Sequence, residues 1–209
     1  QERDTILFVG SFLKEQQRSL LKIGKLLDKE LKALVLLDES DMSARVGLPA
    51  NHKATVIDCD FSSDTALQKA LAPYKHQLLA VTCRAERNIP LLKKAIPHVP
   101  YLNTPTERSL DWTTDKIKMR QMLRGYDKSI SPKFVVAHDA SKETINQIER
   151  KVGFPLIIKP SGLAASLLVT LCYHREELEV GLKKVTKKID QIYAKKKGRG
   201  EPQILVEEF

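Results

Sequence analysis

A single lysine, Lys159, stands at the end of an apolar run in the segment GFPLIIKPSGLAASLLV, residues 153–169. Lysine is rarely buried unless another group pairs with it. The turn that follows is built of small residues, which let backbone N–H groups approach a ligand closely. These residues are Ser161, Gly162, Ala164, Ala165 and Ser166. Backbone N–H groups beside an ammonium bind phosphate oxygens well. The segment therefore favours a polyphosphate site. The alternative is a lysine whose tip leaves a half-buried strand and meets a carboxylate.

The elements around this turn determine how Lys159 is held. Residues 155–160 and 166–174 are apolar strands joined by the turn, so they predict an antiparallel hairpin. The remaining patterns in this half predict strands at 131–139 and 202–209 and helices at 109–126, 141–153 and 175–193. In the first of these helices we expect Thr113 or Thr114 as the cap and Asp115 in the first turn. The second half is thus predicted to be an α+β lobe with antiparallel strands.

The first half alternates between strand and helix patterns. Apolar runs predict strands at 5–10, 32–39, 53–60, 76–83 and 99–105, and helical spacing predicts helices at 14–31, 62–74 and 85–96. Apolar strands separated by helices are typical of a mostly parallel sheet that is covered on both faces. The fold class is therefore α/β, with a Rossmann-like first domain at 1–105 and a second domain at 106–209.

The composition excludes several classes of protein. Of the 209 residues 42% are apolar and 29% are charged, an ordinary globular balance. No stretch approaches the roughly 18 apolar residues of a membrane helix, and the polar start is unlike a signal peptide. Cys59, Cys83 and Cys172 have no CxxC spacing. This argues against a zinc site or a disulfide framework and predicts a reducing, cytoplasmic location.

The net charge of +9 raises the question of a nucleic-acid partner. Basic residues concentrate at 183–190 and 194–200, which we interpret as the solvent face of one helix and the loop after it. The alternative is an electropositive mouth that attracts phosphates. The few aromatic residues do not alternate with Lys or Arg, so no specific nucleic-acid partner is predicted.

Three segments, taken in order, resemble the ATP-grasp superfamily. They are DKIKMRQML at 115–123, GFPLIIKPSGLAAS at 153–166 and QILVEEF at 203–209. The resemblance extends to the domain order, in which a Rossmann-like pre-ATP-grasp domain precedes the first ATP-grasp lobe. It implies 1–105 as that domain and 106–209 as the N-terminal lobe.

The resemblance also implies a nucleotide-binding set. Lys116 matches the helix lysine that contacts the nucleotide phosphates, and Lys159 matches the strand lysine that reaches the α- and β-phosphates. The turn with Ser161, Gly162 and Ser166 matches the loop that folds over the triphosphate. This turn has one glycine where the family loop is usually richer, so a stiffer loop is expected.

The last segment matches the family's adenine-facing hinge. Glu208 and Phe209 are implied to meet the adenine edge through backbone groups, with Glu207 beside them. A slot of Ile157, Val169 and Leu205 would sandwich the purine, although core packing explains these apolar residues equally well.

The activity that the resemblance implies is ATP-dependent ligation. A small-molecule carboxylate attacks the γ-phosphate of Mg-ATP to form an acyl-phosphate, and an amine or similar nucleophile then displaces phosphate. The implied partners are ATP, the carboxylate and a second copy in a homodimer, with no membrane. The family's Mg²⁺ ligands lie beyond the hinge, so they are expected outside this chain, and no catalytic residue is assigned. We interpret Asp58, Asp60 and Asp64 as solvent-facing turn carboxylates rather than metal ligands.

Because the chain is expected to stop at the hinge, we predict no complete turnover by residues 1–209. Three alternatives stay open. The chain could be a module that binds ATP or phosphate without turnover, or a basic nucleic-acid binder. A Rossmann-type oxidoreductase is disfavoured, because Gly10 stands alone where the dinucleotide motif needs G-x-G-x-x-G, and Asp38 more often ends a strand than binds a ribose.

Overall fold

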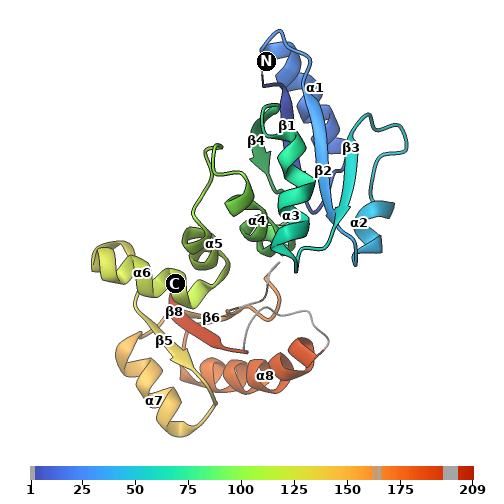
Figure 1. Cartoon of the computed structure of the whole chain (residues 1–209). Helices are drawn as coiled ribbons and strands as arrows, with labels where there is room; N and C mark the ends of the chain where they lie inside the picture. The colour runs from blue at the N-terminus through green and yellow to red at the C-terminus, as the bar shows by residue number, and fades with distance from the viewer. Residues whose placement is uncertain (1–2, 162, 164–165, 195–201) are drawn as a thin grey trace. The chain divides into compact units, whose positions relative to one another are not determined.

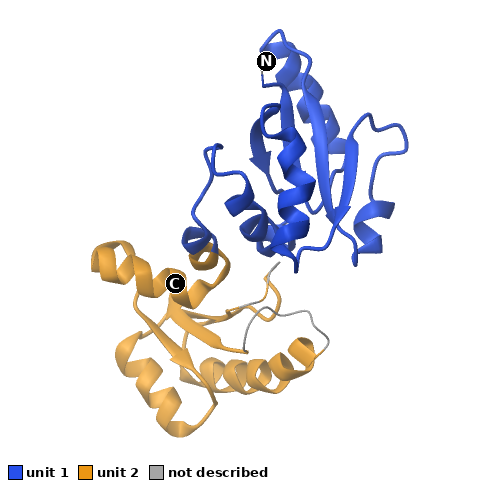
Figure 2. Ribbon diagram, viewed as in Figure 1, with its two compact units in different colours: residues 1–110 blue, residues 111–209 orange. Residues whose placement is uncertain are grey.

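The computed structural model describes residues 3–161, 163, 166–194 and 202–209. The chain divides into two compact units, Gln1–Leu110 and Asp111–Phe209 (Figure 2). The division falls inside α5 (Glu107–Thr114), five residues beyond the boundary expected from the sequence. Among the described residues, no helix is both long and apolar enough to cross a membrane.

Unit 1 is built on a four-stranded parallel sheet (Figure 1). Its strands lie in the order β3-β2-β1-β4 and are β1 (Thr5–Val9), β2 (Lys32–Asp38), β3 (Thr55–Cys59) and β4 (Leu78–Thr82). The helices between and after them are α1 (Lys14–Leu26), α2 (Met42–Val46), α3 (Asp64–Leu71) and α4 (Ile89–Ala95). Short 3-10 turns extend α3 and flank α4, and they are η1 (Ala72–Tyr74), η2 (Glu86–Asn88) and η3 (Ile96–His98).

Both faces of this sheet are covered. One face packs on α3 and α4 through a core that includes Leu36, Leu67 and Leu92. The other face packs on α1 and α2 through Val35, Leu20 and other apolar side chains. Neighbouring strand residues point to opposite faces. A strand with both faces buried must therefore be apolar at successive positions, as β2 is from Ala33 to Leu37.

Unit 1 differs from the sequence prediction at two places. The segment 99–105 is not a strand, because the N–H of Leu102 donates to the carbonyl of Val99 at 3.0 Å and forms a turn. Its apolar residues were mistaken for a strand because Val99 and Leu102 are buried in the core. The short helix α2 was not predicted; Asp41 caps it by accepting from Ser43 N and Ala44 N.

Unit 2 holds an antiparallel sheet in the order β5-β8-β6-β7. Its strands are β5 (Phe134–Ala137), β6 (Leu156–Pro160), β7 (Thr170–Cys172) and β8 (Ile204–Glu208). Its helices are α6 (Lys116–Tyr126), η4 (Lys128–Ile130), α7 (Lys142–Lys151) and α8 (Arg175–Ala194). The α/β class is confirmed, with a parallel sheet followed by an antiparallel one, and the hairpin β6–β7 is the one expected around Lys159.

The expected helix at 109–126 is two helices, α5 and α6, which meet at Asp115. Asp115 adopts an extended conformation, and its carboxylate accepts from Ile117 N at 2.9 Å and Lys118 N at 3.2 Å. It is therefore the N-cap of α6, and the prediction of Thr113 or Thr114 as the cap was wrong. An aspartate satisfies the free N–H groups of a first turn from the cap position, which requires the preceding chain to leave the helix.

Candidate functional site

The antiparallel sheet has one covered face and one face that carries charge. The covered face packs on α7 and α8 through Val135, Leu156, Ile158, Val206 and other apolar side chains. Because Glu207 lies opposite both Ile157 and Phe134 in the ladder, these three residues share the other face. We call this the open face. By register and alternation, the open face consists of Phe134, Val136, Ile157, Lys159, Leu171, Leu205 and Glu207.

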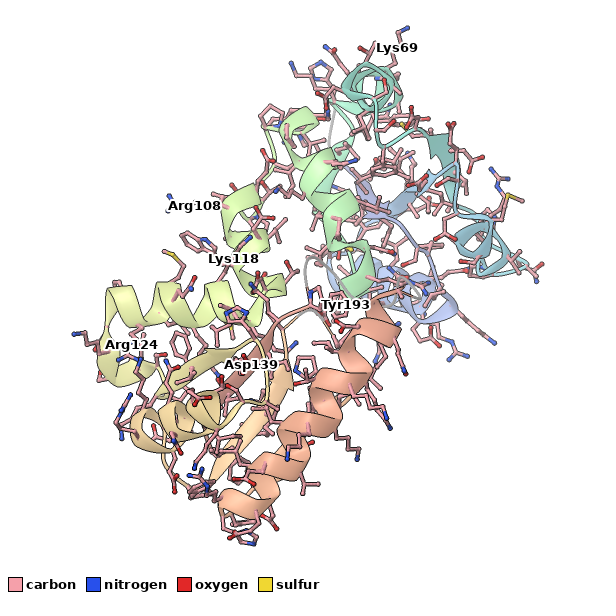
Figure 3. The ribbon with its side chains drawn as sticks, turned by 90° about the horizontal axis from the view of Figure 1, so that it is seen from below. Lys69, Arg108, Lys118, Arg124, Asp139 and Tyr193 are labelled. Carbon is pink, nitrogen blue, oxygen red and sulfur yellow. The ribbon has the colours of Figure 1, made fainter. Side chains whose placement is uncertain are left out.

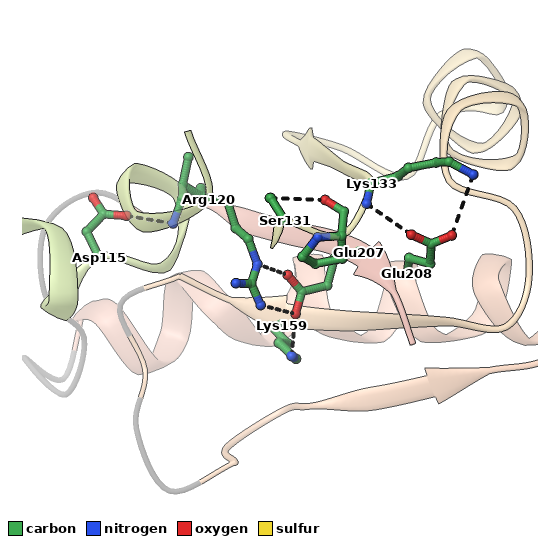
Figure 4. A network of polar contacts seen from close by, with 9 residues as sticks. Asp115, Arg120, Ser131, Lys133, Lys159, Glu207 and Glu208 are labelled. Carbon is green, nitrogen blue, oxygen red and sulfur yellow. Dashed lines mark hydrogen bonds and ion pairs between the residues drawn. The ribbon is translucent and has the colours of Figure 1, made fainter. Parts of the chain in front are cut away.

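A buried carboxylate lies at the centre of the open face. The side chain of Glu207 is 2% exposed and accepts hydrogen bonds from two cations (Figure 4). Arg120 donates from Nε to Oε2 at 2.6 Å and from Nη2 to Oε1 at 3.2 Å. Lys159 donates from Nζ to Oε1. We call Arg120, Glu207 and Lys159 the charge triad.

The pKa of Glu207 reflects two opposing effects. Burial raises it, while the hydrogen bonds and the charges of Arg120 and Lys159 lower it, and the net result is a pKa below the usual 4.5. Glu207 is therefore ionised at neutral pH. The triad holds two positive charges and one negative charge.

A second set of contacts ties α6 to the turn after β6. The ammonium of Lys116 donates to the carbonyl of Ser161 at 3.1 Å and to that of Leu163 at 2.7 Å. The hydroxyl of Ser161 donates to the carboxylate of Asp115 at 2.9 Å. At the start of α6, Lys116 thus holds backbone carbonyls of the turn, and Asp115 holds the side chain of Ser161.

The structure brings the two predicted lysines to one region of unit 2. Lys159 pairs with Glu207, which is the carboxylate alternative that the sequence left open. Its side chain is nevertheless 26% exposed. The ammonium of Lys116 contacts carbonyl oxygens, whereas Arg120 and Lys159 share the one carboxylate of Glu207, so the charge triad keeps a net charge of +1. An anion is the ligand that such an excess favours.

The two glutamates of the last strand point in different directions. Glu207 lies on the open face, whereas the carboxylate of Glu208 turns to Lys133, with Oε1 at 3.5 Å from its Nζ and Oε2 accepting from its backbone N at 3.2 Å (Figure 4). The backbone N–H of Glu208 donates to the carbonyl of Lys133 and that of Phe209 to the carbonyl of Pro155. Both N–H groups are thus used within the sheet, and the phenyl ring of Phe209 is exposed.

The predicted turn residues differ in their surroundings. Ser161 is buried and bonded to Asp115, whereas Ser166 is exposed with a φ of 56°. Gly162 lies outside the described residues. Of the predicted purine slot, Leu205 is buried, Ile157 is half-buried on the open face and Val169 is exposed.

Arg120 was missed by the sequence analysis, although a signal for it exists. Lys116, Arg120 and Arg124 follow at intervals of four, so they lie on one face of α6. Lys116 contacts the turn, Arg120 contacts Glu207, and the guanidinium of Arg124, labelled on α6 in Figure 3, lies 5.8 Å from the ring centroid of Phe134. This basic face of α6 runs along the open face of the sheet.

The other candidate sites, namely the cavities of unit 1, the acidic residues and Gly10, do not bring the predicted site residues together. Two cavities of about 590 and 570 Å³ flank α1 in unit 1, and neither is lined by the predicted site residues. Within the described part of the chain, no group of three or more His, Cys, Asp or Glu side chains could hold a metal ion. Gly10 has a local explanation, since its φ is +79° and a Cβ there would lie 2.6 Å from Asn88 Cγ.

The chain is similar to known proteins in sequence and in fold. No protein-family model matches the chain. The D-alanine–D-alanine ligase of Clostridium acetobutylicum is 32% identical over 87 residues, which are 40% of this chain and 25% of that enzyme. The chain thus spans about a quarter of the length of that curated relative.

Solved structures match over nearly the whole chain. N5-carboxyaminoimidazole synthetase from Staphylococcus aureus, complexed with ADP, superposes with a TM-score of 0.57 and 19% identity over 99% of this chain and 47% of its own. A RimK domain protein ATP-grasp from Sphaerobacter thermophilus has a TM-score of 0.55 and 16% identity over 99% of this chain and 63% of its own. The chain has the fold of these ATP-grasp proteins, which is the fold that the resemblance implied.

Proposed function

We propose that this chain is the nucleotide-binding part of an ATP-dependent ATP-grasp ligase, which activates a carboxylate as an acyl-phosphate for attack by an amine or similar nucleophile. The observation that carries the proposal is the convergence of Lys116, Arg120 and Lys159 beside one open sheet face. The fold of the chain, shared with a synthetase complexed with ADP, and its sequence similarity to a ligase support the same function.

The open face offers both properties that an adenine nucleotide requires. Half-buried Ile157 and Leu171 provide apolar surface for a base. Lys159 lies on the same face, and Lys116 lies at the turn beside it. In the proposed complex, the ammonium groups of Lys116 and Lys159 and the turn at 161–166 bind phosphate oxygens. Because the N–H groups of Glu208 and Phe209 already donate within unit 2, the backbone groups that these two residues offer to the adenine edge are carbonyls, with Glu207 beside them.

The proposed reaction has two steps and needs only ATP, the carboxylate and the amine. A carboxylate oxygen attacks the γ-phosphorus, the bond to the β–γ bridging oxygen breaks, and ADP leaves. The nitrogen of the amine then attacks the acyl carbon, the bond from that carbon to the phosphate oxygen breaks, phosphate leaves, and the amine proton passes to phosphate or solvent. Phosphoryl transfer is catalysed mainly by positioning and by neutralising charge, which lysines at this site would provide.

Magnesium ions accompany ATP in such a reaction. The described residues do not form a set of carboxylates suited to Mg²⁺. We therefore assign no step to the metal within this chain and keep the expectation that its ligands lie outside it.

The test is to map nucleotide binding on the ¹⁵N-labelled chain by NMR. With ATP, we expect resonances of α6, β6 and β8 to shift, and a larger effect with ATP than with adenosine, because phosphates meet the lysines. Shifts confined to unit 1, or none at millimolar ATP, would contradict the proposal. Turnover is tested separately, by screening carboxylates and amines for phosphate release.

A module that binds ATP or phosphate without turnover is the second candidate. It would use the same cationic side chains, Lys116, Arg120 and Lys159, so only turnover separates it from the ligase. Mapped ATP binding without phosphate release by any longer protein that contains this chain would select it.

A third candidate function, nucleic-acid binding, is tested by the salt dependence of RNA or DNA affinity. The exposed lysines Lys183, Lys184, Lys187 and Lys188 line α8, while residues 195–200 of the second basic segment lie outside the described residues. A steep fall of RNA or DNA affinity with salt would support that function. Among the described residues, Cys59, Cys83 and Cys172 form no disulfide, which supports the proposed cytoplasmic location. We also propose a homodimer, which analytical ultracentrifugation would test.

A further inference from the structure

The charge triad contains more positive charge than its carboxylate can neutralise. Glu207 is almost fully buried, and its two partners come from different elements, Arg120 from α6 and Lys159 from β6. Arg120 takes the carboxylate with two hydrogen bonds, while Lys159 shares one of the same oxygens. Bidentate arginine contacts are the stronger and more specific of the two kinds.

Without Arg120, the remaining pair of Lys159 and Glu207 would be neutral. A buried carboxylate with one partner would hold that ammonium as its own counter-ion, since an unpaired buried charge is costly. With Arg120 present, the carboxylate is already neutralised, and the ammonium of Lys159 contributes a net positive charge on the open face. Arg120 thus changes the charge of the site through Glu207.

We infer that Arg120 is a positioning residue for the phosphate site, which neutralises Glu207 so that Glu207 orients Lys159 without cancelling its charge. The inference rests on the proposed nucleotide function and names a residue for which neither the motifs nor the comparisons provide a role. The side chain of Arg120 is 19% exposed and lies against Glu207, so it acts through the carboxylate.

Three variants change the net charge of the triad in different ways and therefore test the inference. The triad carries +1 in the wild type, 0 in Arg120→Met, +2 in Glu207→Gln and +1 again in the double variant. Each unit of charge near a bound phosphate group is expected to change affinity by about tenfold at the effective dielectric of a protein surface. The expected order of tripolyphosphate affinity is Glu207→Gln, then wild type and the double variant together, then Arg120→Met.

A purely structural role for Arg120 predicts a different order. Each substitution would then damage the site, and the double variant would bind no better than Arg120→Met. A direct contact between Arg120 and phosphate would make the loss persist undiminished in the Glu207→Gln background. Either result would overturn the inference.

The experiment is calorimetry of the whole chain with tripolyphosphate, ADP and adenosine. Adenosine affinity should change less than twofold in each variant, because adenosine carries no phosphate. Arg124→Met is the matched control, since it removes an arginine one turn further along the same helix face and contacts the Phe134 ring rather than a carboxylate. It should lower phosphate affinity less than Arg120→Met does, because its charge lies one turn further from the triad and is screened by salt.

Two results separate this inference from the proposed function. If ATP shifts no resonance of unit 2 in the wild type, the proposed function fails and the inference fails with it. If the wild type binds and the order of variants differs from the expected one, only the inference fails. Should Arg120→Met not fold, Arg120→Lys keeps the charge and should bind within about threefold of wild type, and Glu207→Gln alone must still bind phosphate more tightly than wild type.

Discussion

The two sheets of this chain contrast in what covers them. In unit 1, helices cover both faces of the parallel sheet, and β2 is a continuous apolar run from Ala33 to Leu37. In unit 2, α7 and α8 cover one face of the antiparallel sheet, and burial along β6 alternates residue by residue. The difference shows where charged side chains can be placed. A central strand that is buried on both faces, such as β2, leaves no room for a charged side chain in its middle. The open face carries Lys159 on β6 and Glu207 on β8.

The largest expected effect tests this contrast within β6 itself. Ile158 is fully buried against α7 and α8, and its neighbour Ile157 is half-buried on the open face. Ile158→Ala should lower the free energy of unfolding by about 2–5 kcal/mol, because it leaves a cavity in the core. Ile157→Ala should cost about 1 kcal/mol or less. Denaturant unfolding with the NMR signals of unit 2 as the probe measures both, and equal costs would contradict the assignment of the two faces.

The pH dependence of stability is the second test of the contrast, because Glu207 in unit 2 is buried and ionised. The pKa of Glu207 is lower in the folded unit than in the unfolded chain. Its stabilising effect is therefore complete above the unfolded pKa of about 4.5 and is lost as the pH falls through the folded pKa. Glu207→Gln should lower stability at neutral pH and flatten the acid dependence of unit 2. Glu208→Gln, next in sequence but paired at the surface with Lys133, is the control.

Removing either predicted lysine tests whether the open face is a phosphate site. Lys159→Ala and Lys116→Ala should each weaken ATP binding by about 1.5–3 kcal/mol, the value of a charge-assisted hydrogen bond. Lys69→Ala, at an exposed position on α3 of unit 1 (Figure 3), is the control and should bind ATP like the wild type. Unchanged ATP affinity in both site variants would contradict the nucleotide assignment.

Helix caps give the smallest expected effect, and they sharpen the comparison of the two units. Ser63 caps α3 in unit 1 by accepting from Ala66 N, and Ser63→Ala should cost about 1 kcal/mol. Asp115 caps α6 and also accepts from Ser161, so Asp115→Ala should cost about 2 kcal/mol in unit 2. Equal costs in thermal unfolding would show that the contact with the turn contributes nothing.

Much of the fold could be predicted from local pattern. Strands β1 to β8 and the longer helices follow from apolar spacing, because side-chain periodicity is set within each element. The errors occur where a local pattern has two explanations. The apolar residues around Val99 belong to a buried turn, and Asp115 interrupts what the spacing presents as one helix.

Less of the candidate site could be predicted. Lys116, Lys159 and Ser161 were found because motifs mark them, but Arg120 was not, since its partner Glu207 lies 87 residues away. The burial of Glu207 and its pairing with Arg120 were not predicted either, because they depend on which face of β8 the side chain takes. A pair of neighbouring acidic residues in a strand must point to opposite faces.

The sequence by itself determined the strands of both sheets and the longer helices, the parallel and antiparallel character of the two halves, and the lysine at the end of an apolar strand. Only the tertiary structure decided that this lysine shares a buried carboxylate with an arginine from another element. The physical reason is that periodicity acts over a few residues, whereas the pairing of charges depends on the register of strands that are distant in the chain.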